Sequence, residues 1–192
     1  MKVIYVPYPK NKLPELKLTV MRVESNVWWN LGFYKYHYLS SKLNKSAKCF
    51  LFKCNDSIAA FAAVLNQPSK GNPWGYRITR LVVLPSMQNL GLSTRIINFI
   101  GGMVKHFNSE AQLYLMTIHT KIGKYFERSS LWNPTSHNQR IRKDPTIEGN
   151  RYKNRLQRLS YAYRYDGEPK SGYDHLFLPI GELRKNKISK ST

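Results

Sequence analysis

The chain has 192 residues, a length that suits a single domain with a sizeable core. It carries 31 lysine and arginine residues against 11 aspartate and glutamate residues, a formal net charge of +20. This excess favours polyanionic partners, nucleic acid first, because basic side chains release the counterions of a polyanion. It argues against enzymes of polyamines or aminoglycosides, since few carboxylates are available to line a cleft for a cationic substrate. A basic surface that serves only solubility needs far less charge.

The cysteine content and the apolar runs bear on where the protein works. Cys49 and Cys54 show no zinc-ligand spacing, so no metal is expected, and a reduced intracellular compartment is the simplest interpretation. The opening residues, MKVIYVPYPK, lack the charged-then-apolar layout of a signal peptide. Apolar runs such as residues 58–65 are too short to span a bilayer. The sequence therefore predicts a soluble cytoplasmic protein.

The first third of the chain predicts a strand, a helix and a hairpin. Residues 16–23 alternate apolar and polar side chains, as a half-buried strand does. Ser25 is placed to cap a helix over residues 26–39, with Trp28 and Tyr36 on its buried face. Residues 48–53 and 58–65 then form two strands around an Asn-Asp-Ser turn, and the second is apolar enough for a central strand.

The middle of the chain predicts a strand over residues 76–84 and a helix that begins after Gly91. The helix carries an apolar stripe at spacings of three and four residues. Gly101 and Gly102 lie inside this helix and cost it stability, so they predict a close packing point between helix and sheet. A strand over residues 113–118 and a short helix over residues 122–128 follow.

Residues 80–100, RLVVLPSMQNLGLSTRIINFI, combine a strand, a proline stop, a glycine turn and a helix. Such a unit directs free backbone N–H groups to one point at the positive end of the helix dipole. The turn has the spacing Q-x-x-G-x-S, which is neither a Walker loop nor a G-x-G-x-x-G fingerprint. It predicts an anion-binding turn, with an ordinary helix-capping turn as the alternative.

Val82, Pro85, Gln88 and Gly91 fit the pattern V-x-P-x-x-Q/R-x-x-G-x-G/A, so this stretch resembles motif A of the GCN5-related N-acetyltransferase (GNAT) superfamily. Ser93 departs from the final Gly or Ala. The resemblance implies that the turn amides hold the pyrophosphate of acetyl-CoA and that the preceding strand binds the pantetheine arm through its backbone. The implied cofactor-binding residues are Leu81, Val82, Val83, Leu84, Gln88, Asn89, Leu90, Gly91, Leu92 and Ser93.

The predicted order of elements is also similar to the GNAT order from residue 16 to residue 132. It runs β-α-β-β-β-α-β-α and continues into a β-rich tail. The resemblance implies an α+β fold of three layers (α/β three-layer), with a central mixed, mostly antiparallel sheet flanked by helices. Residues 1–192 are expected to form one such domain, with a basic loop and a β-rich tail from about residue 133.

The catalytic candidates come from the same resemblance. GNAT enzymes often place a tyrosine in the helix that contains Tyr125, where its phenol protonates the departing thiolate. The alternative is a tyrosine that packs beside Phe126 and Trp132. His37 and His119 are candidate general bases, with structural hydrogen bonding as the alternative for each.

A second resemblance involves His37-Tyr38, Cys49-Phe50 and Arg80-Leu81-Val82. These pieces are similar to the Mom DNA-modification proteins of Mu-like phages, which are GNAT-like enzymes that modify adenine in DNA. The resemblance adds Tyr38 to the catalytic candidates and implies a phage-encoded protein in the host cytoplasm. Mom proteins lack a clear pyrophosphate turn. This chain has one, which favours ordinary CoA use.

The tail is strongly basic and contains tyrosines. Residues 133–158 predict a loop, and residues 159–165 and 175–180 predict strands. Tyr152, Tyr161, Tyr163 and Tyr165 alternate with basic residues, a pattern that suits base stacking combined with phosphate contacts. A solvated loop is the alternative. The nucleic-acid-binding candidates are Arg140, Arg142, Lys143, Arg151, Lys153, Arg155 and Arg158.

These observations predict an acyl-CoA-dependent N-acyltransferase that modifies nucleic acid, with phage DNA bases favoured. A base amine is hidden in a duplex, so the enzyme would flip the base or act on a single strand. Two alternatives stay open. The acceptor is a protein lysine or a small amine in the first, and the chain is a non-catalytic nucleic-acid-binding GNAT fold in the second.

Overall fold

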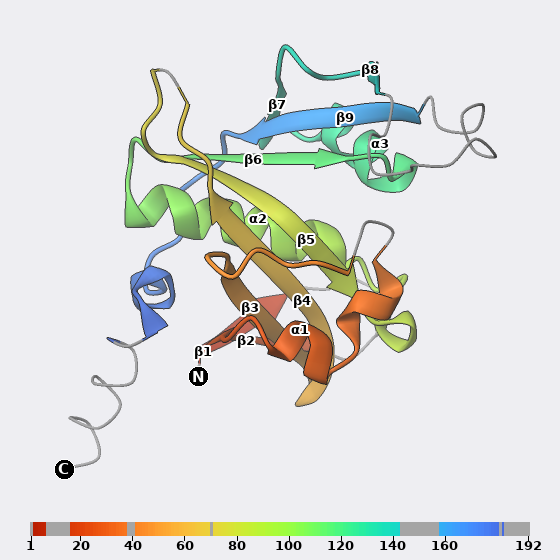
Figure 1. Cartoon of the computed structure of the whole chain (residues 1–192), viewed down its shortest axis with the longest axis vertical. Coiled ribbons are helices and arrows are strands. Elements are labelled where there is room, and N and C mark those ends of the chain that lie inside the picture. Colours follow the sequence, from red (N-terminus) through yellow and green to blue (C-terminus); the bar gives the residue numbers. More distant parts are fainter. Residues whose placement is uncertain are drawn as a thin grey trace.

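The computed structural model describes residues 2–6, 16–37, 41–69, 71–142, 158–180 and 182. Within them, nine strands form one sheet in the order β1-β2-β3-β4-β5-β6-β9-β7, and β8 pairs with β9 outside this path (Figure 1). β5 and β6 are parallel, and the other neighbouring strands are antiparallel. The expected mixed, mostly antiparallel sheet is confirmed. The strands are β1 (Lys2–Val6), β2 (Leu16–Val23), β3 (Lys48–Cys54), β4 (Ser57–Asn66), β5 (Gly75–Val83), β6 (Gln112–Thr117), β7 (Trp132–Pro134), β8 (Arg140–Arg142) and β9 (Arg158–Tyr165).

Helices cover both faces of this sheet, as the α+β expectation requires. α1 (Val27–Asn30) and the 3-10 turn η1 (Phe33–Tyr36) lie on one face, and α2 (Leu92–Phe107) and α3 (Thr120–Arg128) on the other (Figure 1). Two apolar clusters result. The larger one packs α2 and α3 against the sheet, and the smaller one is built around Trp28, Phe33 and Phe61 under α1.

The hairpin of β3 and β4 follows from its turn residues. Asn55 and Asp56 have φ of 46° and 66°, and these short polar side chains tolerate the left-handed region that a two-residue turn requires. The predicted hairpin is confirmed. β4 has buried residues on both faces, as expected for a central strand.

The helix predicted after Ser25 is much shorter than expected. α1 ends at Asn30, because Gly32 takes a left-handed φ of 71° and turns the chain into η1. Asn26 rather than Ser25 occupies the cap position, and its side chain makes no capping hydrogen bond. Trp28 is fully buried as predicted, but Tyr36 is 53% exposed, so its place on a buried face was wrong.

The close packing predicted at Gly101 and Gly102 is confirmed. A Cβ on Gly101 would lie 2.4 Å from Cγ of Tyr165 in β9, and a Cβ on Gly102 would lie 2.9 Å from Cβ of Lys170. The amide of Lys170 also donates to the Gly102 carbonyl at 2.8 Å. The two glycines therefore let α2 approach β9 and the segment after it.

The tail contains more structure than the sequence indicates. β7 and β8 fall inside the predicted loop, where short strands pair with β9, and β1 was not predicted. The strand expected over residues 175–180 is wrong. The 3-10 turn η3 (Asp174–Phe177) occupies the first part of this range. Phe177 packs against the rings of Phe50 and Phe107 and does not enter the sheet.

Candidate active site

β5 and β6 separate in the middle of the sheet. They pair in parallel from Gly75 with Gln112 to Ile78 with Leu115, and the pairing then ends. β5 continues to Val83 along β4, while β6 continues to Thr117 along β9. The C-terminal halves of the two parallel strands therefore leave an opening in the sheet.

A β-bulge lies where this separation begins. Ala63 pairs with Arg80 and Val64 pairs with Ile78, so Thr79 is the extra residue, and its hydroxyl donates to the Ala63 carbonyl at 3.2 Å. A bulge shifts the alternation of side chains by one residue. Ile78 and Val83 consequently both pack on the α2 side, although an even and an odd position face opposite ways in a regular strand.

The backbone of β5 beyond the bulge has a free edge. The Leu84 amide donates to the Ala59 carbonyl of β4 at 2.9 Å, so the alternation directs the polar backbone groups of Leu81 and Val83 toward the opening. The Gln88 side-chain amide donates to the Val83 carbonyl at 3.2 Å. This contact holds the turn after η2 (Pro85–Met87) against the end of β5.

The turn leads directly into the N-terminus of α2. Asn89 and Gly91 have φ of 65° and 68°. Among the described residues, the first amide of this region that bonds within the helix is that of Arg95, which donates to the Gly91 carbonyl. The preceding amides, including those of Leu92 and Ser93, point out of the helix end, as the first N–H groups of any helix do.

The charges around this helix end favour an anion. The first turn of α2 contains no acidic residue. Nε of Arg95 lies 3.7 Å from the position that a Cβ on Gly91 would occupy, so a guanidinium adjoins the turn. Leu92 is buried as a residue, whereas Gly91 is exposed and Ser93 half-buried, so the accessible part of this helix end lies at Gly91 and Ser93. Backbone amides, the helix dipole and Arg95 together form a suitable phosphate site.

Tyr125 belongs to α3, and its hydroxyl contacts Asn98 of α2. Nε1 of Trp132 donates to Oδ1 of Asn98 at 2.8 Å, and an indole N–H can only donate, so the amide orientation of Asn98 is fixed. Nδ2 of Asn98 therefore donates to the Tyr125 hydroxyl oxygen at 2.6 Å. Ser129 Oγ also lies 3.5 Å from that oxygen. The Tyr125 oxygen acts as an acceptor in these contacts, which leaves its own proton to be donated elsewhere.

His37 lies on the opposite face of the sheet, beside Trp28 and Arg80. Its ring contacts Trp28 edge-on at 5.8 Å. Burial, with the positive charge of Arg80 as the second cause, lowers the pKa of His37 to about 4. The Arg80 guanidinium donates to the carbonyls of Thr79 at 2.8 Å and Lys42 at 2.6 Å. His37 is therefore neutral at physiological pH and a weaker base than an ordinary histidine.

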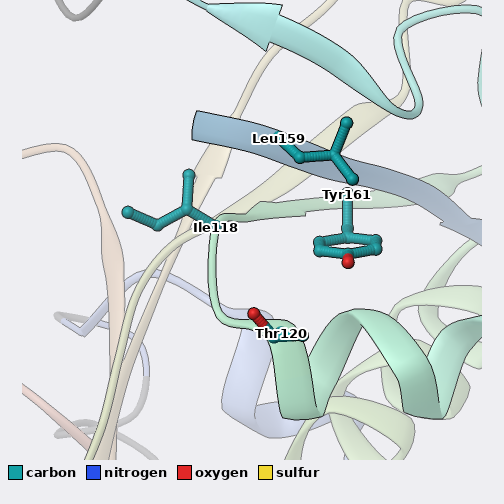
Figure 2. Close-up of a pocket in the computed structure, with 4 residues that line it drawn as sticks. All are labelled: Ile118, Thr120, Leu159 and Tyr161. Atoms are coloured by element: carbon teal, nitrogen blue, oxygen red, sulfur yellow. The ribbon is translucent and has the colours of Figure 1, made fainter. Parts of the chain in front are cut away.

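The structure places Tyr125 and His37 on opposite faces of the sheet, and it brings His119 to neither of them. His119 is exposed just before α3, where its amide donates to the Thr117 hydroxyl at 3.0 Å. An open pocket of about 330 Å³ lies next to it, lined by Ile118, Thr120, Leu159 and Tyr161 (Figure 2). Figure 2 shows the Tyr161 ring directed toward α3. Tyr38 lies outside the described residues.

The basic tail is described only in part. Arg140 is exposed in β8, and the backbones of Arg142 and Arg158 pair with each other between β8 and β9. Lys143, Arg151, Lys153 and Arg155, together with Tyr152, lie outside the described residues.

The base-stacking role of the β9 tyrosines is wrong. Tyr161, Tyr163 and Tyr165 are 7%, 3% and 9% exposed, because all three face the helices and not the solvent. The Tyr163 ring stacks on Phe126 with centroids 4.9 Å apart. Ser160 and Ala162 between the tyrosines are buried as well, so β9 is covered on both faces over much of its length, and a sequence pattern of tyrosine and basic residues does not distinguish this from an aromatic binding surface.

Two residues of the site, Asn98 and Arg95, were not singled out from the sequence. Asn98 lies on the helix face away from the apolar stripe of α2, so no sequence signal indicates its partly buried hydrogen bonds. Arg95 has no such signal either, because its importance depends on which backbone groups it approaches in the folded chain, and Arg80 was named only as part of the Arg80-Leu81-Val82 resemblance. Within the described residues, no cluster of His, Cys, Asp and Glu is suited to a metal ion. None of the helices described has the length and apolar character needed to cross a bilayer.

No protein-family model matches this sequence, and a comparison with curated proteins gives no significant match. Solved structures do match. The ribosomal-protein-S18-alanine N-acetyltransferase of Escherichia coli superposes with a TM-score of 0.56 at 14% identity, covering 81% of this chain and 96% of its own. A GNAT family acetyltransferase of Elizabethkingia anophelis with acetyl-CoA bound gives 0.55 at 16%, covering 78% and 98%. The chain has the GNAT fold. The spermidine/spermine N-acetyltransferase SpeG of Vibrio cholerae shares this GNAT fold with a TM-score of 0.55 at 9% identity, covering 77% of this chain and 91% of SpeG.

Proposed function

We propose that the chain is an acyl-CoA-dependent N-acyltransferase that modifies nucleic acid, with DNA bases favoured as acceptors. The observation that carries the proposal is the meeting of two binding elements at the end of β5. The free backbone edge of Leu81 and Val83 faces the opening of the sheet, and the amide-rich turn at Gly91 follows it directly. GNAT structures solved with acetyl-CoA support the choice of ligand.

The residues present fit acetyl-CoA. The amides of the turn and of the first turn of α2 suit a pyrophosphate, and Arg95 adds positive charge beside Gly91. The backbone groups of Leu81 and Val83 that face the opening suit the amides of a pantetheine arm, and the Val83 carbonyl already accepts a hydrogen bond from the Gln88 side chain. Ser93 is small enough for a phosphate to approach the helix end. Acetyl-CoA supplies an activated acyl group as a thioester.

The side chains divide the proton transfers between the two faces of the sheet. Tyr125 holds a proton on its hydroxyl, oriented by Asn98, and donates it to the leaving group. His37 is the candidate to accept the proton of the attacking amine: it is neutral, and its lowered pKa makes it a weaker base than an ordinary histidine. An exocyclic amine of a base is a poor nucleophile, so this proton is removed during attack rather than before it.

The acceptor is inferred from charge and from the Mom resemblance. A net charge of +20 favours a polyanion. The pieces of the resemblance are distant in the sequence, but His37 lies within the electrostatic influence of Arg80 in the folded chain. Arg80 belongs to the Arg80-Leu81-Val82 piece on β5, next to the opening. This proximity favours a single acceptor site that includes both segments. The Mom resemblance further suggests a protein that acts in the cytoplasm of a phage-infected host.

A protein or small amine is the alternative acceptor. The Escherichia coli neighbour is named for an alanine of a ribosomal protein and SpeG for spermidine and spermine. A polyamine suits this chain poorly, because its own charge is strongly positive. A protein lysine or terminal amine remains the second candidate, and a nucleic-acid-binding GNAT fold without catalysis the third.

Replacing Gly91 with aspartate tests the cofactor site. Isothermal titration of the purified chain with acetyl-CoA should show binding, and G91D should weaken it by at least about tenfold, because a carboxylate then lies against the turn amides. Gly71→Asp is the matched control. Gly71 also has a left-handed φ, 84°, but lies in the β4–β5 loop, where a Cβ would have no atom within 4 Å. Absence of acetyl-CoA binding by the unaltered chain would overturn the proposed function.

Labelled acetyl-CoA tests the acceptor. Transfer of ¹⁴C-acetyl to an oligonucleotide, followed by nucleoside mass spectrometry of DNA from expressing cells, should show a modified base. Transfer to a peptide with none to DNA or RNA selects the alternative acceptor, and binding of DNA without any transfer selects the non-catalytic fold.

A further inference from the structure

Three large apolar side chains are exposed together at the end of α1 and in η1. Trp29 is 40% exposed, Leu31 40% and Tyr36 53%. We call these three residues the α1–η1 aromatic surface. Their neighbours Trp28 and Phe33 are fully buried and anchor the segment in the smaller apolar cluster. The exposed side chains are therefore carried by a backbone segment that the buried Trp28 and Phe33 hold against the sheet.

The backbone under this surface is ordered by local hydrogen bonds. The Gly32 amide donates to the Trp29 carbonyl at 3.0 Å, and the Lys35 amide donates to the Gly32 carbonyl at 3.1 Å. Gly32 supplies the left-handed turn between the two helical pieces. Trp29 and Tyr36 have few rotatable bonds of their own, so a flat partner that binds them loses little conformational freedom.

The segment that carries the α1–η1 aromatic surface and the segment after it are rich in exposed lysines. Lys35 is exposed inside η1, and Lys42 and Lys45 are exposed a few residues later. Glu24 is the one carboxylate between residues 24 and 55 of the sequence. A partner of this surface therefore needs flat apolar groups combined with negative charge, and unpaired nucleotides have both.

The surface is continuous with the acceptor side of the candidate site. His37 directly follows Tyr36, and the Lys42 carbonyl accepts a hydrogen bond from Arg80 on β5. The Ser41 carbonyl likewise accepts one from Nε1 of the buried Trp28 at 2.7 Å. A strand bound across Trp29 and Tyr36 would thus lead toward His37.

We infer that the α1–η1 aromatic surface binds single-stranded nucleic acid by stacking unpaired bases on Trp29 and Tyr36, while the nearby lysines contact phosphates. The inference rests on the nucleic-acid acceptor of the proposed function and names where that acceptor is held. Base stacking is thereby assigned to Trp29 and Tyr36, whereas the sequence pattern indicated it for the tyrosines of β9, which are buried.

The test measures binding of a fluorescein-labelled, mixed-sequence DNA 12-mer to the full chain by fluorescence anisotropy. Trp29→Ala and Tyr36→Ala should each weaken binding by about tenfold, as expected for loss of one base–aromatic stack. Trp74→Ala is the matched control, because Trp74 is equally exposed at 45% but lies just before β5, away from α1. Thermal melting confirms that each variant is folded.

Salt dependence separates stacking from charge. In W29A the slope of log K against log salt should stay the same, since no phosphate contact is lost, whereas Lys35→Gln should make the slope shallower by about one unit. Equal affinities of W29A, Y36A and the unaltered chain for the DNA 12-mer would overturn the inference. This result is also the one expected if the surface binds a polypeptide and not a nucleic acid. Equal losses in W29A and W74A would overturn it as well. Titration with acetyl-CoA tests the proposed enzyme independently of either result.

Discussion

At the scale of single residues, Arg80 connects two parts of the candidate site that are distant in the sequence. Its guanidinium lies on β5 and donates to the carbonyl of Lys42, just after the segment that contains His37. Burial and the charge of Arg80, in that order, keep the pKa of His37 at about 4. Arg80 therefore links β5 to the segment after His37 and adds to the effect of burial in lowering the pKa of His37.

Replacing Arg80 with glutamine should raise the pKa of His37 partway from about 4 toward the ordinary value of 6.5, because the positive charge is lost while burial remains. NMR titration of the histidine Cε1–H resonances measures this, with His37→Gln used for assignment. Arg77→Gln is the matched control, since Arg77 lies on the same strand and contacts Gln67 instead. An unchanged pKa of His37 in R80Q would show that the charge of Arg80 does not contribute to the lowered pKa.

The same shift has a consequence for stability. Folded His37 has a lower pKa than unfolded histidine, so the unfolded state binds more protons between about pH 4 and 6.5. The contribution of His37 to the free energy of unfolding is therefore complete above pH 6.5 and decreases as the pH falls toward 4. R80Q should narrow this pH window from its acidic side.

At the scale of elements, β9 joins α2 and α3 to the sheet through two matching contacts. Tyr165 occupies the space over Gly101 in α2, and Tyr161 occupies the space over Gly123 in α3. Tyr163 lies between them and stacks on Phe126. Each helix thus approaches a tyrosine ring of β9 at a residue without a side chain.

Gly123→Ala should destabilise the protein by about 1–3 kcal/mol, although alanine is the better helix former. A Cβ on Gly123 would lie 2.4 Å from Cδ2 and Cγ of Tyr161, so the ring or the helix must move. Urea denaturation followed by circular dichroism gives the free energy of unfolding. The double variant G123A/Y161L should be less destabilised than the sum of the two single variants. Strict additivity, or a more stable G123A, would refute the contact.

The sequence predicts elements where the cause is local and fails where the cause is tertiary. The β3–β4 hairpin follows from two turn residues, and α2 follows from one apolar stripe. The tyrosine pattern of β9 was misinterpreted because burial depends on the two glycines of other helices. The bulge at Thr79, which shifts the alternation of β5 beside the opening, depends on pairing with β4 and has no sequence signal.

At the scale of the whole molecule, the excess of positive charge affects stability and binding in opposite ways. Between described residues, the ion pair found is that of His106 and Asp174 at 3.4 Å, and it requires a protonated histidine. With a net charge of +20, like charges in the compact state are left to repel one another. A bound polyanion relieves this repulsion.

Raising the salt concentration from about 20 mM to about 300 mM should therefore raise the melting temperature, because counterions screen the repulsion. The same change should weaken binding of the DNA 12-mer, since its counterion release becomes less favourable. At low salt, the oligonucleotide itself should raise the melting temperature by binding the folded state. Scanning fluorimetry at constant pH with and without DNA measures all three. A melting temperature that falls as salt is added would show that attractive contacts outweigh the repulsion, and the net charge would then give no separate reason to expect a polyanionic partner.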